Sequence, residues 1–389
     1  MEKQKDRAWL EIDPDCIEQN YHQIKESIPK DCEIMAVIKA NAYGLGAVTI
    51  GKLLEKLNCP YLAVACLEEA MELRESGITT PILTLGPIDP NNVGIAIDHQ
   101  IEVPAISLSQ AEALSQKALL HGKRIKVHIK ADAGLSRFGI LLKNRIPQAV
   151  EEALAIAALP GLEAVGVLTH YTASEDPKGD EFNLAQIALF DEYTLRLEEN
   201  GLHLKKHSAS SAFTALYPQC HNNYVRVAAL LLGLQAPMYR GTVTKQSTQF
   251  KARIMQIKEL EMGTSISYGP TTYTLRHTKI AVIPVGYADG IRRTLSNHGY
   301  FLVKGKRAPI IGKITMDYII LDITDIEDVK EGDIVTIFGE DHGAVFHAYQ
   351  LANLYPGSVG ELVSMIHLRV PRFYQYKGKI AACRQDLGL

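Results

Sequence analysis

A lysine at the end of an apolar run is the residue in this sequence best suited to covalent chemistry. Lys39 follows the run AVI, and the glycine-bearing turn ANAYGLG comes directly after it. Burial lowers the pKa of a lysine, so its neutral amine can form a Schiff base with an aldehyde such as pyridoxal phosphate. The alternative is a strand-end lysine whose ammonium reaches water, and Lys39 alone does not separate the two. Gly44 and Gly46 permit close approach of a ligand to the backbone, which favours the first.

Further polar side chains follow apolar runs later in the chain. They are Lys130, Asp132, Arg137, Thr169, His170, His207, Ser208, Ser210, Ser211 and Arg226. Ser211 precedes a short apolar helix predicted over 212–216, where its hydroxyl and free backbone N–H groups could bind a phosphate. A plain helix cap at Ser210 or Ser211 satisfies the same pattern. These side chains can act together only if the strands that carry them end at one place.

The spacing of the apolar runs indicates how that convergence arises. Eight β-rich runs alternate with helix-like stretches, and they span residues 33–39, 61–65, 82–85, 102–106, 125–130, 164–169, 204–208 and 224–227. Amphipathic helices are predicted between them, among others over 67–76, 109–121, 144–158 and 182–200. Eight β/α units that close on themselves form a TIM barrel, whose active site lies at the carboxyl ends of its strands. The polar residues therefore converge on one mouth.

The pattern changes after residue 240. Strands are predicted over 250–257, 278–285, 300–303, 308–311, 318–323 and 332–338, with glycines between them and few helical periods. We therefore expect an α/β protein with an N-terminal (β/α)8 barrel over residues 1–240 and a mostly-β domain over 241–389. The first 12 or so residues are expected to pair with the second domain.

Composition limits the classes of function. Hydrophobic residues make up 47% and charged residues 22%, as in an ordinary soluble globular protein. The 41 basic and 44 acidic residues give a net charge of -3 without charge blocks, which suggests neither nucleic acid nor membrane as a partner. No signal peptide or long apolar run is present, and the six cysteines lack CxxC pairs, so we expect a cytoplasmic chain without disulfides or a metal site.

The segment AVIKANAYG at 36–44 resembles the pyridoxal-phosphate signature of the alanine racemase family. That family has fold type III, in which a TIM barrel is joined to a β domain. Other segments that resemble the family follow in order along nearly the whole chain. They are HIKAD at 128–132, Arg137 with Gly139, Thr169 and His170, HSASSA at 207–212, Val225 and Arg226, SYG at 267–269, GYADG at 286–290 with Arg293, Gly312, Met316 with Asp317, and RVPR at 369–372.

The resemblance implies a two-base racemase. Lys39 would hold pyridoxal 5'-phosphate and act as the base on one face of the substrate α-carbon. Tyr268 matches the tyrosine that acts on the other face and comes from the partner subunit, so a homodimer with shared active sites is implied. Racemisation needs such a pair because the proton leaves one face and returns to the other. Arg293 and His207 are expected to tune Tyr268, since a free tyrosine is a poor base at neutral pH.

The resemblance implies further roles in binding. Arg226 would face the pyridine nitrogen of the cofactor, supported by His170, and Arg137 would bind the substrate carboxylate with the backbone of Met316. Lys130 matches a lysine that many family members carbamylate to hold that arginine. The phosphate would be bound by Tyr43, Ser211 and the backbone at Ala228 and Ala229. Tyr287 and Asp317 are expected as supporting residues.

One departure from the family leaves the substrate open. Gly360 stands where the family usually has a tyrosine that narrows the pocket, so serine or another larger amino acid is an alternative to alanine. Tyr355 could refill the gap. A non-catalytic pyridoxal-phosphate-binding protein is disfavoured by the second domain, and a decarboxylase is disfavoured by Arg226. The predicted function is the interconversion of L- and D-alanine, which supplies D-alanine for peptidoglycan.

Overall fold

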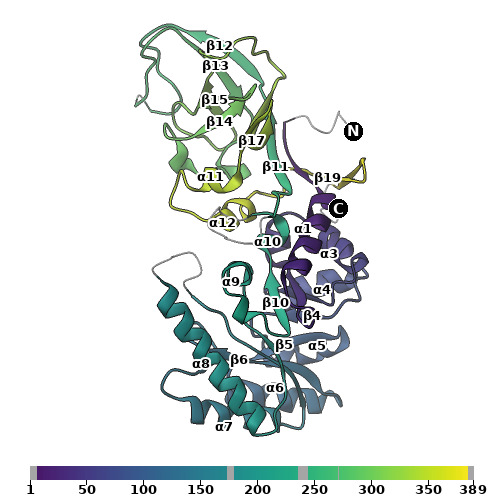
Figure 1. The fold of residues 1–389 in the computed structure, drawn as a ribbon. Coiled ribbons are helices and arrows are strands. Elements are labelled where there is room, and N and C mark those ends of the chain that lie inside the picture. The colour runs from purple at the N-terminus through teal and green to yellow at the C-terminus, as the bar shows by residue number, and fades with distance from the viewer. Residues whose placement is uncertain (1–6, 173–178, 235–243, 270, 384–389) are drawn as a thin grey trace.

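The chain forms a barrel of parallel strands surrounded by helices at one end of the molecule, and a β-rich unit at the opposite end (Figure 1). This computed structural model describes residues 7–172, 179–234, 244–269 and 271–383, with side chains up to residue 378. The boundary predicted at 240 and 241 lies outside the described residues. Within the described ranges, no helix has both the length and the apolar character needed to cross a membrane.

Eight parallel strands close the barrel. In chain order they are β2 (Glu33–Val37), β3 (Tyr61–Val64), β4 (Ile82–Thr84), β5 (Ile101–Ala105), β6 (Ile125–Asp132), β8 (Leu162–Leu168), β9 (Lys205–His207) and β10 (Tyr224–Val227). Each strand pairs in parallel with the next, β10 pairs with β2, and the contact between β5 and β6 completes the sheet, while β7 (Ile140–Leu141) extends β6. The predicted eight-stranded barrel is confirmed.

Helices follow the strands on the outside of the barrel. They are α1 (Pro14–Ser27), α3 (Ala47–Lys56), α4 (Leu67–Glu75), α5 (Val93–Asp98), α6 (Leu108–Leu120), α7 (Ile146–Ala157) and α8 (Asp180–Glu199), with the shorter α9 (Ser211–Leu216) and α10 (Ala229–Leu232) near the mouth. Local capping sets several of their starts. The Asp13 side chain, for example, accepts a hydrogen bond from the N–H of Cys16 where α1 begins.

The second unit is built mainly from strands. They are β11 (Thr248–Arg253), β12 (Gln256–Leu260), β13 (Thr278–Ile283), β14 (Tyr300–Val303), β15 (Lys306–Pro309), β16 (Ile319–Asp322), β17 (Ile334–Asp341), β18 (Ala344–Phe346), β19 (Arg372–Tyr376) and β20 (Lys379–Cys383), joined by the short helices α11 (Ala348–Ala352) and α12 (Val359–Ser364). The N-terminal strand β1 (Ala8–Ile12) lies between β11 and β19 in the same sheet.

The single strand predicted over 250–257 is two strands in different sheets. The N–H of Ile254 bonds to the carbonyl of Asp333, whereas the N–H of Met255 bonds to that of Val282. β11 therefore ends paired with β17, and β12 begins a separate sheet with β13 and β16. The apolar pattern is continuous across this point, so only the pairing partners reveal the break.

Residues of the second unit hold the turn that follows the candidate lysine. The Arg372 guanidinium donates to the carbonyl of Gly44 at 3.0 Å, and the Tyr374 hydroxyl donates to that of Leu45 at 2.6 Å. A Cβ at Gly44 would lie 2.8 Å from the carbonyl oxygen of Val363 in α12, so glycine is needed for this close approach. The two units thus meet beside Lys39.

Candidate active site

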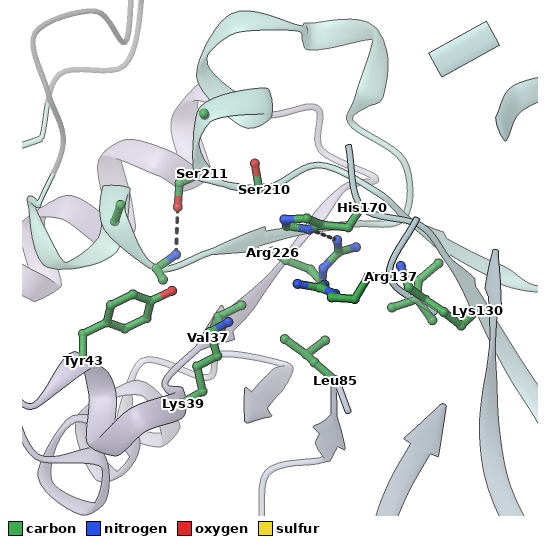
Figure 2. A pocket seen from close by; sticks show the side chains of 14 residues that line it. Val37, Lys39, Tyr43, Leu85, Lys130, Arg137, His170, Ser210, Ser211 and Arg226 are labelled. Atoms are coloured by element: carbon green, nitrogen blue, oxygen red, sulfur yellow. Dashed lines mark hydrogen bonds between the residues drawn. The ribbon is translucent and has the colours of Figure 1, made fainter. Parts of the chain in front are cut away.

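A cavity of about 240 Å³ opens at the carboxyl ends of the barrel strands (Figure 2). Nine residues proposed from the sequence line it: Lys39, Tyr43, Lys130, Arg137, His170, Ser211, Arg226, Ala228 and Ala229. Val37, Leu85, Leu168, Ser210 and Ala212 complete the lining. Residues from six different strands or the segments after them therefore meet at one place, as the barrel geometry requires.

Lys39 does not end a strand, contrary to the sequence-based expectation. β2 ends at Val37, and Lys39 begins a tight left-handed turn, α2 (Lys39–Tyr43), in which residues 40–43 have φ between 50° and 55°. Left-handed backbone costs about 1 kcal/mol or more for each non-glycine residue, so tertiary contacts must hold it. The Glu69 carboxylate does so by accepting the N–H of Ala40 at 2.6 Å and that of Ala65 at 2.7 Å.

The environment of Lys39 favours its neutral amine. Burial lowers the pKa of the amine, and the nearby cations of Arg137 and Arg226 lower it further, whereas Glu69 opposes them. An uncharged lysine is both a nucleophile toward an aldehyde and a base toward a proton. The contacts that define the left-handed turn therefore place a reactive amine in the cavity.

Arg226 is fixed at the base of the cavity by backbone and histidine contacts. Its Nη1 donates to the carbonyl of His207 at 2.5 Å, and its Nη2 donates to those of Thr169 and Ser208 at 2.7 and 3.1 Å. His170 Nδ1 lies 3.1 Å from Nη2 and must accept, since a guanidinium can only donate. Burial lowers the pKa of Arg226 to about 10, so the group stays cationic at neutral pH.

Hydrogen-bonding groups gather at the opposite side of the cavity. The Ser211 hydroxyl accepts the N–H of Ala228 at 2.9 Å, and the Tyr43 hydroxyl points toward the same corner (Figure 2). Burial raises the pKa of Tyr43, which keeps its phenol protonated and able to donate. Hydroxyls and backbone N–H groups suit the oxygens of a phosphate. The residues present would suit pyridoxal phosphate: this corner could bind a phosphate, Lys39 an aldehyde and Arg226 a ring nitrogen.

Lys130 and Arg137 form the side of the cavity away from Tyr43 (Figure 2). Lys130 is buried, and desolvation together with Arg226 and Arg137 holds the pKa of its amine well below the usual value. The loop that carries Arg137 is shaped by the Asp132 carboxylate, which accepts the N–H groups of Gly134 and Ser136. The buried amine of Lys130 thus lies close enough to the guanidinium groups of Arg226 and Arg137 for both to lower its pKa.

Five further proposed residues lie on the second unit and do not line this cavity. Tyr268 is 70% exposed on the turn between β12 and β13, where the Ser267 hydroxyl donates to the carbonyl of Lys313. Met316 and Tyr287 are also exposed. The other two members of this group are Arg293, which is exposed, and Asp317, which pairs with Arg369 at 2.8 Å.

His207 has a different environment from the expected one. It is fully buried beneath Arg226, with Nε2 lying 2.7 Å from His128 and Nδ1 lying 3.2 Å from Arg226. Both ring nitrogens are therefore engaged, and within one chain His207 does not contact Tyr268. The contacts of Glu69 and Glu102 were not predicted from the sequence. For Glu102, the carboxylate inside the apolar run EVPAI was a signal that could have indicated a buried polar contact.

The comparisons agree along nearly the whole chain. Residues 12–236 match the family described as alanine racemase, N-terminal domain, and residues 247–374 match alanine racemase, C-terminal domain. Alanine racemase 2 of Caldanaerobacter subterraneus subsp. tengcongensis is 36% identical over 374 residues, which cover 95% of each protein.

Solved structures give the same result. The alanine racemase of Bacillus anthracis with bound L-Ala-P has a TM-score of 0.89 at 32% identity and covers 97% of each chain. The alanine racemase of Bartonella henselae with covalently bound pyridoxal phosphate has a TM-score of 0.84 at 27% identity, over 95% of this chain and 99% of that one. With both family domains matched and its fold shared at full length, the chain belongs to the alanine racemase family.

Proposed function

We propose that this protein interconverts L- and D-alanine with pyridoxal 5'-phosphate bound in the barrel cavity, and supplies D-alanine for peptidoglycan. The observation that carries the proposal is the position of Lys39, between the corner formed by Tyr43 and Ser211 and the buried cation of Arg226. Such a set binds the phosphate, the aldehyde and the ring nitrogen of one cofactor. The resemblance to alanine racemases along both domains supports the same activity.

Lys39 and Tyr268 act as the two bases. Bound pyridoxal phosphate supplies an electron sink that weakens the bond between the substrate α-carbon and its proton. On one face, Lys39 accepts that proton as an amine or returns it as an ammonium, and on the other face Tyr268 of the partner subunit does so as a phenolate or a phenol. Arg226 remains cationic and would keep a ring nitrogen bound opposite it unprotonated, which would limit side reactions.

Arg137 positions the substrate by its carboxylate, aided by the backbone of Met316 from the partner subunit. The buried amine of Lys130, whose pKa is lowered by desolvation and by the nearby guanidinium groups, is suited to react with carbon dioxide. That reaction forms an N–C bond, releases one proton and leaves a carbamate anion. The anion would offset the positive charge of the neighbouring Arg137, which the bare amine does not.

A second copy of the chain completes each active site. Tyr268, Tyr287, Met316 and Arg293 are exposed on the second unit instead of lining the cavity of their own barrel. We infer a division into a barrel ending near residue 240 and a β domain that serves the other subunit. An active monomer in analytical ultracentrifugation would contradict the shared site, whereas a homodimer that loses activity on dilution supports it.

Gly360 bears on the choice of substrate through its neighbour Tyr43, which lines the cavity. A Cβ built on Gly360 would lie 3.5 Å from the ring of Tyr43, in ordinary contact, so a larger residue would extend beside Tyr43. Tyr355 is not among the residues that line the cavity, and its ring packs near Arg292 instead. The missing side chain at Gly360, beside Tyr43, favours serine, and the relatives favour alanine. Turnover of L-alanine and L-serine by the parent and by Gly360→Tyr separates the two.

The two-base mechanism is tested by three variants. Lys39→Ala should lose the visible absorbance of the bound cofactor and all turnover. Tyr268→Phe should keep the absorbance but lose racemisation, because only one face can still exchange its proton with solvent deuterium. Tyr273→Phe is the control, since Tyr273 is a nearby exposed tyrosine without an assigned role. Unchanged turnover in either of the first two variants would falsify the mechanism.

A further inference from the structure

A chain of polar side chains crosses the barrel interior beneath Arg226. TIM barrels usually fill this space with branched apolar residues. Here the Tyr61 hydroxyl on β3 donates to the Glu102 carboxylate on β5. Glu102 lies 2.9 Å from His128 Nε2 on β6, and His128 Nδ1 lies 2.7 Å from His207 Nε2 on β9. His207 Nδ1 in turn lies 3.2 Å from Arg226 Nη1.

Arg226 determines the direction of every hydrogen bond in this chain. Since a guanidinium can only donate, His207 Nδ1 must be the acceptor, and a neutral His207 then carries its proton on Nε2. That proton is donated to His128 Nδ1, so the proton of a neutral His128 resides on Nε2. It points at the Glu102 carboxylate, which accepts. Each donor thus meets an acceptor from Arg226 to Glu102, with both histidines as the same tautomer.

The hydrogen-bond directions require a neutral His207 and an ionised Glu102, and the surroundings of these two residues favour both states. Burial lowers the pKa of His207 well below its usual value, and His128 and Arg226 lower it further, so the ring is neutral. Burial by itself would raise the pKa of Glu102, but the hydrogen bonds from His128 and Tyr61 hold it below its usual value, so the carboxylate is ionised. A buried cation and a buried anion are therefore linked through the neutral ring of His207 and through His128.

The neighbouring strand leaves space for this arrangement. Gly166 on β8 lies opposite His128 in the register, next to a shift between Val127 and His128. A Cβ on Gly166 would lie 2.2 Å from His128 Nδ1, so any other residue would displace the imidazole. The absence of a side chain at 166 is an independent sign that the position of the His128 ring is built into the barrel.

We propose that Glu102 and His128 are positioning residues that set the tautomer of His207 and thereby hold the guanidinium of Arg226 at the cavity floor. That Arg226 then faces the ring nitrogen of the cofactor rests on the proposed function. A carboxylate in direct contact with Arg226 would offset its positive charge where the cavity opens. Glu102 is separated from Arg226 by the two imidazole rings. It instead accepts the last hydrogen bond of the chain, from His128, at the other end of the barrel.

Loss of the acceptor at position 102 should reverse the chain. Without Glu102, the Tyr61 hydroxyl, which lies 3.4 Å from His128 Nε2, loses its acceptor and can donate to that nitrogen, so the His128 proton is more stable on Nδ1. That proton would face the Nε2–H of His207, which must then move its own proton to Nδ1. Two donors, the Nδ1–H of His207 and the guanidinium of Arg226, would then oppose each other. The guanidinium is expected to shift, although no residue in the cavity has changed.

Nitrogen NMR of the holoenzyme tests the tautomers directly. With 15N-labelled histidine, and signals assigned with a His128→Gln variant, both His128 and His207 should be neutral with the proton on Nε2. A proton on Nδ1, or a doubly protonated ring, at either residue overturns the proposal. This measurement needs no turnover, so it stands or fails separately from the proposed racemase activity.

Two variants at position 102 test the functional consequence. Glu102→Leu should move the His207 proton to Nδ1 and lower kcat about tenfold, with a smaller change in KM, as expected for loss of a hydrogen bond to a charged group. Glu102→Gln keeps an acceptor oxygen and should retain the tautomers and most of kcat. Thr84→Val is the control for a buried strand change, because the Thr84 hydroxyl has no hydrogen-bond partner among the described residues. Parent-like tautomers and kcat in Glu102→Leu would refute the proposal.

Discussion

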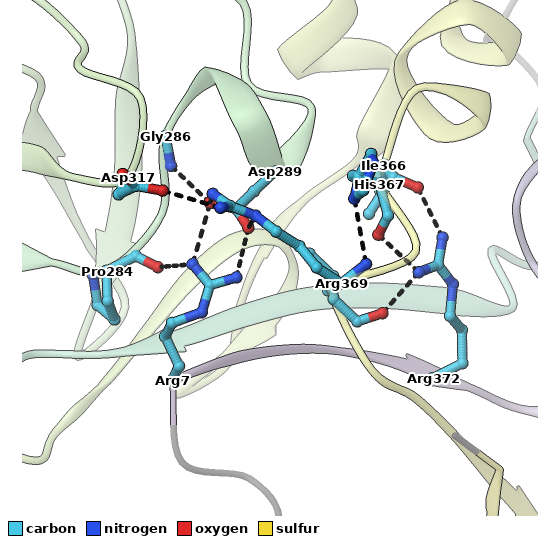
Figure 3. A network of polar contacts seen from close by, with 10 residues as sticks. Arg7, Pro284, Gly286, Asp289, Asp317, Ile366, His367, Arg369 and Arg372 are labelled. Carbon is cyan, nitrogen blue, oxygen red and sulfur yellow. Dashed lines mark hydrogen bonds and ion pairs between the residues drawn. The ribbon is translucent and has the colours of Figure 1, made fainter. Parts of the chain in front are cut away.

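Replacing Asp289 with asparagine should destabilise the second unit near the residues proposed to serve the partner subunit. Asp289 is fully buried and accepts hydrogen bonds from the guanidinium groups of Arg7 and Arg369 and from the N–H of Gly286 (Figure 3). It ends the turn in which the N–H of Ala288 bonds to the carbonyl of Met316 at 3.0 Å. One carboxylate therefore joins the N-terminal segment, this turn and the segment before β19.

The size of the expected loss of stability follows from how deeply the side chains of Asp289, Arg7 and Arg369 are buried. The Asp289→Asn side chain would present an amide N–H₂ to two arginines and would remove the charge that they share, although Arg369 keeps its ion pair with Asp317. Removing one member of a buried ion pair costs about 3–5 kcal/mol. The Arg7 and Arg369 side chains are 33% and 34% exposed, so water compensates in part and the lower value applies. At about 2 °C per kcal/mol, the Tm should fall by about 6 °C.

Thermal unfolding of the holoenzyme at neutral pH measures this loss, with Asp325→Asn as the matched control. Asp325 also pairs with an arginine, Arg276, at 2.6 Å, but its side chain is 76% exposed. An exposed pair contributes little, so the control should shift the Tm by less than about 2 °C. Equal shifts in Asp289→Asn and Asp325→Asn would show that burial does not set the strength of the Asp289 contacts.

Three further predictions concern the same elements. Burial by itself would raise the pKa of Asp289, but Arg7 and Arg369 hold it below its usual value, so its stabilisation is complete above about pH 4 and is lost as the pH falls further. The Tm difference between the parent and Asp289→Asn should therefore shrink in acid, and a constant difference would contradict this. Glu69→Gln cannot accept both N–H groups that Glu69 binds, so cofactor affinity, measured by absorbance after dialysis, should fall about tenfold, while the exposed Glu68→Gln should not change it. Ser211→Ala should weaken cofactor binding by a similar factor without changing the Tm of the cofactor-free protein by more than about 2 °C, and unchanged affinity would place the phosphate elsewhere.

Much of the fold could be predicted because local pattern and tertiary structure agree. Barrel strands buried on both faces are short apolar runs, and their helices carry one apolar face, so both appear in a single sequence. The break between β11 and β12 could not be predicted in this way. Ile254 and Met255 continue the apolar pattern, and only their bonds to Asp333 and Val282 assign them to different sheets.

The turn after Lys39 is a second case in which distant contacts override local preference. Alanine and tyrosine at 40–43 favour right-handed backbone, yet all four residues of this stretch are left-handed. Glu69, Arg372 and Tyr374 hold the turn, and two of these lie more than 300 residues away in the sequence. No local pattern could have indicated this conformation.

The sequence by itself determined which side chains would meet at the mouth of the barrel. Parallel strands bring their carboxyl ends together, so a residue such as Lys39 or Arg226 is placed once the strands are counted. Only the tertiary structure decided what lies beneath them. The orientation of His207 depends on His128 and Glu102 from two other strands, and on the space left by Gly166 on a third. Hydrogen-bond direction is a property of such assembled neighbours, and it cannot be seen in any one segment.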